Sequence, residues 1–237
     1  RGVGVDHPAG SRQHRACPAC GGHAGDDDSM RATLKAAKAR HVVVGAHPSY
    51  PDRQNFGRKS MKMPQDELES LLGQQVRTLA SLARGQGVAI DHLKPHGALY
   101  NDASRDPTLA EFIVRLTREA RIRAVMGPPD SMLAKIAHAT GTDFLAEGFA
   151  DRTYARDGSL LARSEAGAVI HEADAQAAQV ISMIEGSTVI ASDKHVISLH
   201  VDTICLHGDT AGAVQSALAL REALHSRGIE IKAQAAP

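Results

Sequence analysis

The chain has 237 residues, enough to bury a large core, and barrels of alternating strands and helices commonly reach this length as one domain. Its 27 basic residues balance its 27 acidic ones, so no net field exists to hold a nucleic-acid backbone or an anionic membrane surface, and we expect neither partner. No apolar run approaches the roughly 20 residues needed to cross a bilayer. Three cysteines are too few for a disulfide framework, so we predict a cytoplasmic protein.

Short apolar, β-branched runs alternate with amphipathic segments from about residue 28 onward, which predicts alternating strands and helices. In chain order we predict a helix over 29–39, a strand over 41–46, a helix over 64–84, a strand over 88–93, a helix over 107–120, a strand over 122–126, a helix over 130–139, a strand over 143–146, a helix over 172–184, strands over 188–190 and 201–206, and a helix over 210–226. Parallel strands joined by helices follow from this order, in a single α/β domain over residues 1–237. The periodicity does not choose between a closed barrel and an open doubly wound sheet.

Several predicted helices have recognisable start signals. Pro64 and Pro107 suit a first helical turn, where the missing N–H is not needed. Asp106, Asp130 and Asp209 are good N-cap residues. The first residues of the chain are the exception to this order, because Arg1–Arg15 contains no apolar run that could form an inner barrel strand.

Titratable residues recur directly after the predicted strands, where α/β proteins of both architectures place their active sites. They are His47 and Asp52 after the first strand, Lys94, His96 and Tyr100 after the second, Asp151 and Arg152 after the fourth, and His207 and Asp209 after the last. A glycine-rich turn before the first helix adds His23, Gly25 and Asp26 and is a plausible seat for a phosphate or carboxylate.

Two chemistries fit such a set of residues. Converging imidazoles and carboxylates can bind a divalent metal, with His23, His47 and His96 as the ligands we would choose, or they can activate water. Lys94 adds a positive charge suited to a phosphate or an oxyanion. For any one histidine, a helix cap or a hydrogen-bonded core residue is an equally good interpretation.

The cysteines carry a weaker signal. Cys17 and Cys20 imitate half of a zinc site, but no second CxxC or HxxxH follows, so a structural zinc site is disfavoured. Cys205 lies inside an apolar strand, where a small buried hydrophobe is the expected role.

Seven stretches of the sequence, taken in order, resemble the LamB/YcsF family, whose members form the A subunit of bacterial 5-oxoprolinase. The matching stretches are CGGHAGD at 20–26, GAHPSYPD at 45–52, FGR at 56–58, KPHGALYN at 94–101, FADRTY at 149–154, DGSLLAR at 157–163 and CLHGDT at 205–210. The resemblance implies an irregular (β/α) barrel of the polysaccharide-deacetylase type. It also implies ATP-dependent opening of 5-oxoproline (pyroglutamate) to L-glutamate, in a complex with subunits B and C.

The amino terminus departs from the family pattern. The family opens with a strand that carries an Asp-Leu-Asn-Ala-Asp-Leu-Gly-Glu type motif, and residues 1–18 show none. The resemblance therefore implies that the first strand and its acidic residues are missing or altered, and that residues 1–18 are atypical or disordered.

The residues after the strands can be assigned roles on this combined basis. As the catalytic set we predict His47, His96, His207, Asp209 and Lys94, with one His–Asp pair as the general base towards water. As the set that binds substrate or phosphate we predict His23, Gly25, Asp26, Asp52, Arg58, Tyr100, Asp151 and Arg152. ATP is the expected cosubstrate and a divalent metal a further candidate. Two alternatives stay open: a metal-dependent amide or acetamide hydrolase, and an inactive scaffold or binding protein of the complex.

Overall fold

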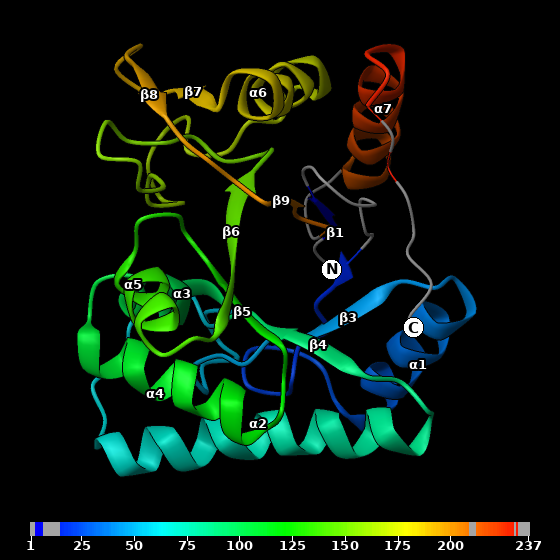
Figure 1. Ribbon diagram of the computed structural model, residues 1–237, viewed down its shortest axis with the longest axis vertical. Coiled ribbons are helices and arrows are strands. Elements are labelled where there is room, and N and C mark those ends of the chain that lie inside the picture. Colours follow the sequence, from blue (N-terminus) through cyan, green and yellow to red (C-terminus); the bar gives the residue numbers. More distant parts are fainter. Residues whose placement is uncertain (1–2, 7–14, 209–211, 230, 232–237) are drawn as a thin grey trace. The chain divides into compact units, whose positions relative to one another are not determined.

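The computed structural model describes residues 3–6, 15–208, 212–229 and 231, which divide into two compact units (Figure 1). The amino-terminal unit comprises Arg15–Leu145, and the carboxy-terminal unit comprises Ala146–Gln234 together with the first strand of the chain. Strands alternate with helices in both units, so the predicted α/β fold class is confirmed. Among the described residues, no helix has the length and apolar character needed to cross a membrane.

A parallel sheet forms the centre of the amino-terminal unit. Its strands are β2 (Arg15–Ala16), β3 (Val43–Ala46), β4 (Ile90–Leu93) and β5 (Ala124–Gly127), each paired with the next. Its helices are α1 (Asp27–Ala39), α2 (Gln65–Gly85), α3 (Gly97–Ala103), α4 (Pro107–Glu119) and α5 (Met132–Ala139). The register shifts between Val44 and Gly45, and beyond the shift Gly45 lies opposite His92.

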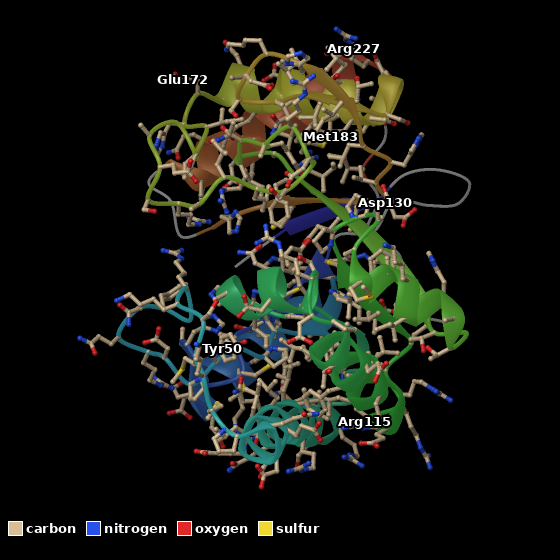
Figure 2. The ribbon with its side chains drawn as sticks, turned by 90° about the vertical axis from the view of Figure 1, so that its left-hand side faces the viewer. Tyr50, Arg115, Asp130, Glu172, Met183 and Arg227 are labelled. Carbon is tan, nitrogen blue, oxygen red and sulfur yellow. The ribbon has the colours of Figure 1, made fainter. Side chains whose placement is uncertain are left out.

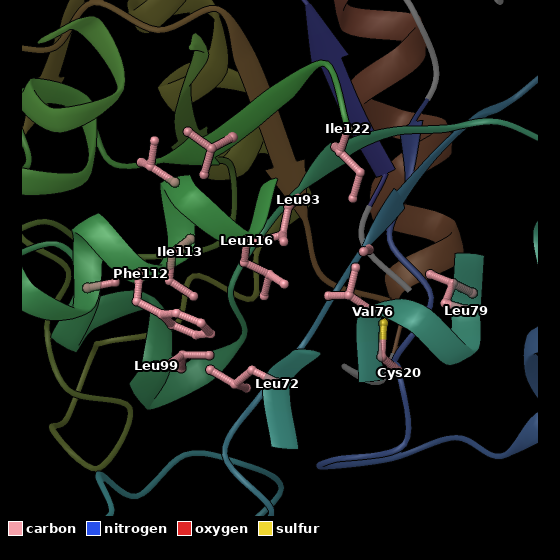
Figure 3. Close-up of a cluster of buried hydrophobic side chains, with 14 of the residues drawn as sticks. Cys20, Leu72, Val76, Leu79, Leu93, Leu99, Phe112, Ile113, Leu116 and Ile122 are labelled. Carbon is pink, nitrogen blue, oxygen red and sulfur yellow. The ribbon is translucent and has the colours of Figure 1, made fainter. Parts of the chain in front are cut away.

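The core of this unit lies between the sheet and its helices. Leu72, Val76 and Leu79 recur at helical spacing along α2 and are buried, so α2 turns an apolar stripe inward. Leu93 of β4 and Ile113 of α4 belong to the same cluster (Figure 3). Burying each such side chain stabilises the fold by about 1.5–3 kcal/mol. This packing holds the ends of β3 and β4 in place.

The carboxy-terminal unit is built around a second set of strands. These are β1 (Val3–Asp6), β6 (Asp143–Phe149, which begins in the amino-terminal unit), β7 (Thr188–Ile190), β8 (Val196–Ser198) and β9 (Thr203–Leu206). The strand β9 pairs parallel with β6 and antiparallel with β1, and β7 and β8 form a separate antiparallel pair. The helices α6 (Ala173–Gly186) and α7 (Ala213–Ser226) pack against each other, with Val180, Met183 (labelled in Figure 2) and Leu224 buried.

Two sequence predictions about strands need comment. The expectation that the first fifteen residues form no barrel strand is wrong: β1 pairs antiparallel with β9, and β2 begins at Arg15 and pairs with β3. That the first strand is altered relative to the family stays a prediction. We did not predict β8, because its alternation over three residues is too short to distinguish from a loop. The predicted disorder of residues 1–18 falls largely on residues 1–2 and 7–14, which lie outside the described residues. The prediction of a single domain stays a prediction.

Of the predicted helix caps, one is confirmed and one is wrong. Asp106 caps α4 by accepting hydrogen bonds from the N–H groups of Thr108 and Leu109. At α5 the predicted cap is wrong by one residue: Ser131 accepts from the N–H of Ala134, while Asp130 takes a left-handed conformation with φ 56°. Asp209 lies outside the described residues.

Candidate active site

The ends of β3 and β4 bring two of the predicted histidines together. His47 directly follows β3, and His96 occupies the N-cap position of α3, three residues after β4. The N–H of Lys94 donates to the carbonyl of Ala46, and the N–H of His96 donates to the carbonyl of Pro48, both at 2.9 Å. The pairing of the two strands therefore continues into their loops, which carries both imidazoles to the same edge of the sheet.

Three imidazoles form a compact cluster at this edge. The ring of His23 lies parallel to that of His96, with centroids 3.6 Å apart and an interplanar angle of 7°. His47 stands perpendicular to both, at 4.8 Å from His96 and 5.7 Å from His23. Phe56 contacts His23 edge-on at 5.0 Å. Gly57 passes so close that a Cβ there would lie 2.9 Å from the Cβ of His23, and its φ of +65° also favours glycine.

A chain of hydrogen bonds runs through two of these rings. Nδ1 of His47 lies 2.7 Å from the carbonyl of Lys94, and Nε2 of His96 lies 2.9 Å from the carbonyl of Phe56. Between the rings, Nε2 of His47 and Nδ1 of His96 are 3.0 Å apart. A carbonyl only accepts, so each ring gives its N–H outward, and the contact between the rings needs one further proton. The two facing nitrogens can therefore form a hydrogen bond only when the pair takes up one proton.

The surroundings of His47 and His96 disfavour the binding of this further proton. Burial, followed by the positive charges of His96 and Lys94, holds the pKa of His47 well below its usual value. Burial and the charge of His23 lower the pKa of His96 to about 3. The pair is consequently neutral at pH 7 by itself, and a neighbouring anion would favour the shared proton by opposing these charges.

The same rings do not form a metal cage. Among the residues that the structure describes, no group of three or more His, Cys, Asp or Glu side chains could hold a metal ion. Both nitrogens of His47 and of His96 contact each other or a backbone carbonyl. His23 contacts the other two rings by stacking and edge contact, so the metal predicted at His23, His47 and His96 stays a prediction through which we derive no chemical step.

Positive charge lies beside the imidazoles. Lys94 is buried, with Nζ 5.9 Å from the centre of the Tyr100 ring, and the guanidinium of Arg58 lies 4.9 Å from the centre of the Phe56 ring. A buried ammonium is costly unless it meets negative charge or π electrons, and the Tyr100 ring supplies π electrons to Lys94. These positions agree with the roles predicted for Lys94, Arg58 and Tyr100, which stay predictions.

Asp52 and Asp26, the acidic residues predicted for the site in this unit, form hydrogen bonds that fix the backbone around them. Oδ1 of Asp52 accepts from the N–H and the side-chain amide of Asn55, at 3.1 and 2.9 Å, which shapes the loop that presents Phe56. Asp26 is the N-cap of α1 in a capping box with Ser29. Gly25 has φ +82°, and a Cβ there would lie 2.9 Å from the carbonyl of Ala19. Asp26 and Gly25 thus set the path of the chain next to His23.

The carboxy-terminal unit holds a His–Asp pair. Both carboxylate oxygens of Asp151 lie 2.9 Å from Nδ1 of His207, and the backbone N–H of His207 also donates to Asp151 at 3.3 Å. Asp151 is buried and His207 is partly exposed, with 23% of its side chain accessible. Burial raises the pKa of Asp151, but the hydrogen bond and charge of His207 outweigh it and leave the pKa lowered. The ionised carboxylate fixes the tautomer with Nδ1–H, which makes Nε2 the basic atom of the ring.

The helix α6 sets the position of this pair. The side-chain amide of Gln179 donates to the carbonyls of Phe149, Ala150 and Arg152, at 2.8, 3.2 and 2.9 Å. These bonds hold the segment that carries Asp151. The guanidinium of Arg152 is itself buried and donates to the carbonyls of Ala168 and Leu161. Arg152 therefore stabilises the loop that follows it. Its predicted role in binding substrate or phosphate stays a prediction.

Comparison with known proteins identifies the family. A model described as the LamB/YcsF family matches residues 14–237. The chain belongs to the LamB/YcsF family. It is 44% identical over 216 residues to the A subunit of 5-oxoprolinase from Methylococcus capsulatus, covering 91% of this chain and 83% of that protein. The corresponding A subunit from Chloroflexus aurantiacus is also 44% identical over 216 residues, with 91% and 85% covered.

A solved structure extends the likeness to three dimensions. The crystal structure of a lactam utilization protein from Thermus thermophilus superposes with a TM-score of 0.85 at 32% identity, covering 93% of this chain and 88% of that one. The resemblance inferred from the seven LamB/YcsF stretches is thus confirmed, and so is the fold class.

Some features of this LamB/YcsF chain were not predicted from sequence. The carbonyl of Phe56 and the ring of Phe149, stacked on His207 at 5.6 Å, take part in the two clusters without a sequence signal of their own. The pairing of Asp151 with His207 joins residues 56 positions apart. Both were predicted as site residues, His207 in the catalytic set and Asp151 in the binding set, and the prediction for Asp209 falls outside the described residues.

Proposed function

We propose that this chain is the A subunit of a 5-oxoprolinase, which opens the lactam ring of 5-oxoproline to L-glutamate with hydrolysis of ATP and works with subunits B and C. The names of its relatives, which refer to 5-oxoprolinase and to lactam utilization, support this class of substrate. The observation that carries the proposal is the pair of His207 and Asp151, an oriented imidazole base on a chain of this family.

The chemistry explains why ATP would be required. An unactivated lactam is a poor electrophile because amide resonance stabilises it. Transfer of the γ-phosphoryl group to the lactam oxygen releases ADP and leaves an imidate-like carbon with phosphate as a leaving group. Water then adds to that carbon and the C–N bond breaks with protonation of the nitrogen, which opens the ring to a γ-glutamyl phosphate. A second water hydrolyses this acyl phosphate to glutamate and phosphate.

Each cluster has its own part in this proposal. Nε2 of His207, oriented by Asp151, takes the proton from the attacking water, a contribution of typically 10²–10⁴-fold in rate. Within the amino-terminal unit, His47 and His96, once they share a proton, form a proton donor next to Lys94. Lys94 stabilises a carboxylate or a transferred phosphoryl group.

The test is reconstitution with subunits B and C, following glutamate release from 5-oxoproline with and without ATP. The variant His207→Ala should lose the ATP-dependent reaction. The matched control is His195→Ala, because His195 is also paired with an aspartate, Asp193 at 3.1 Å, but is 53% exposed in the same unit. Equal turnover of the two variants would remove His207 from the mechanism.

Other outcomes would favour the alternatives. Hydrolysis of acetamide or another simple amide without ATP would favour an amide hydrolase. Binding of subunits B and C with no turnover of 5-oxoproline by the wild-type chain would favour a scaffold. A cytoplasmic location is part of the proposal, because Cys17, Cys20 and Cys205 are present as thiols and thiols fit a reducing compartment.

A further inference from the structure

A second chain of polar side chains crosses the amino-terminal unit, apart from the groups used above. Sγ of Cys17 lies 3.2 Å from Nε2 of His92, and Nδ1 of His92 lies 3.3 Å from Oδ2 of Asp91. Cys17 directly follows β2, and the other two residues belong to β4. A thiol, an imidazole and a carboxylate in this order form the arrangement that activates cysteine nucleophiles.

Asp91 is held in its ionised form. Arg123 donates to its two oxygens at 2.8 and 2.9 Å, and Arg15 donates to Oδ2 at 2.8 Å. Burial raises the pKa of Asp91, but the hydrogen bonds of His92 and Arg123 outweigh it and lower the pKa below its usual range. A carboxylate only accepts, so Nδ1 of His92 carries the proton that it donates. Nε2 then faces Cys17 as the acceptor for the thiol proton.

The backbone holds His92 in this position. His92 is fully buried, and its ring lies over Gly45 of β3, where a Cβ would overlap Nε2 of the imidazole. Only a glycine opposite His92 leaves room for the ring. The base is therefore fixed by the packing of two paired strands.

The three cysteines differ in their surroundings. Cys20 and Cys205 are buried, at 3% and 2% exposure, while Cys17 is partly exposed. Burial raises the pKa of Cys20 to about 12, so that thiol is unreactive near neutral pH. Cys17 alone of the three combines access with a contact to an imidazole.

We infer that Cys17 is a nucleophilic thiol activated by His92, and a site of covalent modification by small electrophiles such as peroxides. In the reaction with a peroxide, the Cys17 sulfur attacks one oxygen and the O–O bond breaks. The thiol proton, held on Nε2 of His92, goes to the departing oxygen, which leaves as water or an alcohol. Sulfur is oxidised to a sulfenic acid and the peroxide is reduced.

The charges around the pair determine its pH dependence. The titratable and charged groups near it are Arg15, Asp91, Arg123 and the thiol of Cys20. Burial lowers the pKa of His92, but the negative charge of Cys17 and the hydrogen bonds of Asp91 and Cys17 outweigh it and raise the pKa. The thiolate–imidazolium form should therefore persist below the pKa of an ordinary thiol, about 8.5.

The experiment measures the alkylation of Cys17 by iodoacetamide in the full chain as a function of pH, with the modified peptide identified by mass. We expect a midpoint below that of N-acetylcysteine, and a rate at pH 7 at least about tenfold higher than in His92→Phe, because an ordinary thiol is only a few per cent ionised there. Hydrogen peroxide with dimedone should label Cys17 in the wild type, and Cys20→Ser and Cys205→Ser should keep the label.

A midpoint for Cys17 equal to that of N-acetylcysteine would overturn the inference, as would equal rates in the wild type and His92→Phe. If His92→Phe does not fold, the Cys20→Ser/Cys205→Ser double variant retains the native base. Its thiolate absorbance, titrated with pH, must then appear below the range of an ordinary thiol. The substitution Asp91→Asn should shift the alkylation midpoint upward, since the amide lacks the charge that favours the imidazolium.

Discussion

Both carboxylate oxygens of Asp151 lie within 2.9 Å of the same nitrogen of His207, so the buried carboxylate and the imidazole act as one unit. Asp151 lies two residues after β6, and His207 directly follows β9, which pairs parallel with β6. The carboxylate both orients the ring and stabilises its protonated form, which is what a general base requires during water attack.

The substitution Asp151→Asn should lower ATP-dependent glutamate release by the reconstituted complex by about 10²–10⁴-fold, because the amide no longer fixes the tautomer with Nδ1–H. The corresponding exposed pair gives the control: Asp193→Asn should leave the rate unchanged, since Asp193 contacts His195 at the surface. A rate for Asp151→Asn within a factor of two of the control would contradict the assigned role. Circular dichroism checks that both variants fold.

Folding stability should fall as the pH drops below about 6.5, because His96 is neutral in the folded protein. Its folded pKa, about 3, lies below the unfolded value of 6.5, so the unfolded chain binds the extra proton first and gains stability relative to the folded one. Each such histidine changes the free energy of unfolding by up to roughly 1.4 kcal/mol per pH unit. Urea unfolding between pH 7 and pH 4 measures the slope, which should be shallower in His96→Ala. A slope unchanged by that substitution would mean that His96 is protonated in the folded state.

The substitution Asp91→Asn should cost about 1.5–3 kcal/mol of stability at pH 7, because it removes charge-assisted bonds to Arg15 and Arg123. The folded pKa of Asp91 is depressed, so its contribution is fully present above the unfolded pKa of about 3.9 and is lost as the pH falls through the folded value. Urea unfolding of wild type and variant at pH 7 and near pH 2 should therefore show a smaller difference in acid. A difference that stays constant with pH would point to a steric effect instead of lost charge.

The substitution Gly45→Ala should destabilise the chain by about 1–3 kcal/mol and slow alkylation of Cys17, because its Cβ would overlap Nε2 of His92. Gly85 provides the matched control, since a Cβ at the end of α2 meets nothing within 4 Å. There the substitution to alanine should be neutral or stabilising by up to about 1 kcal/mol. Thermal unfolding of both variants gives the comparison, and similar melting temperatures would show that the imidazole can move aside.

The sequence alone determined where chemistry would gather along the chain. His47, His96 and His207 each follow an apolar run that ends in a loop, and α/β proteins place functional residues in the loops after their strands. These signals are local: alternation, a proline or glycine at an element end, and a polar residue after it. The seven stretches that match the LamB/YcsF family could be recognised for the same reason.

Only the tertiary structure decided which side chains meet. The contact of Cys17 with His92 spans 75 positions and depends on the registers of β2 with β3 and of β3 with β4, and that of Asp151 with His207 spans 56 positions and depends on the register of β6 with β9. The role of Asp26 as a helix cap, and the hydrogen bonds of His47 and His96 to backbone carbonyls, likewise follow from packing. The physical reason is that a side chain's partners are set by neighbours distant in sequence, whereas its place at the end of a strand is set by neighbours along the chain.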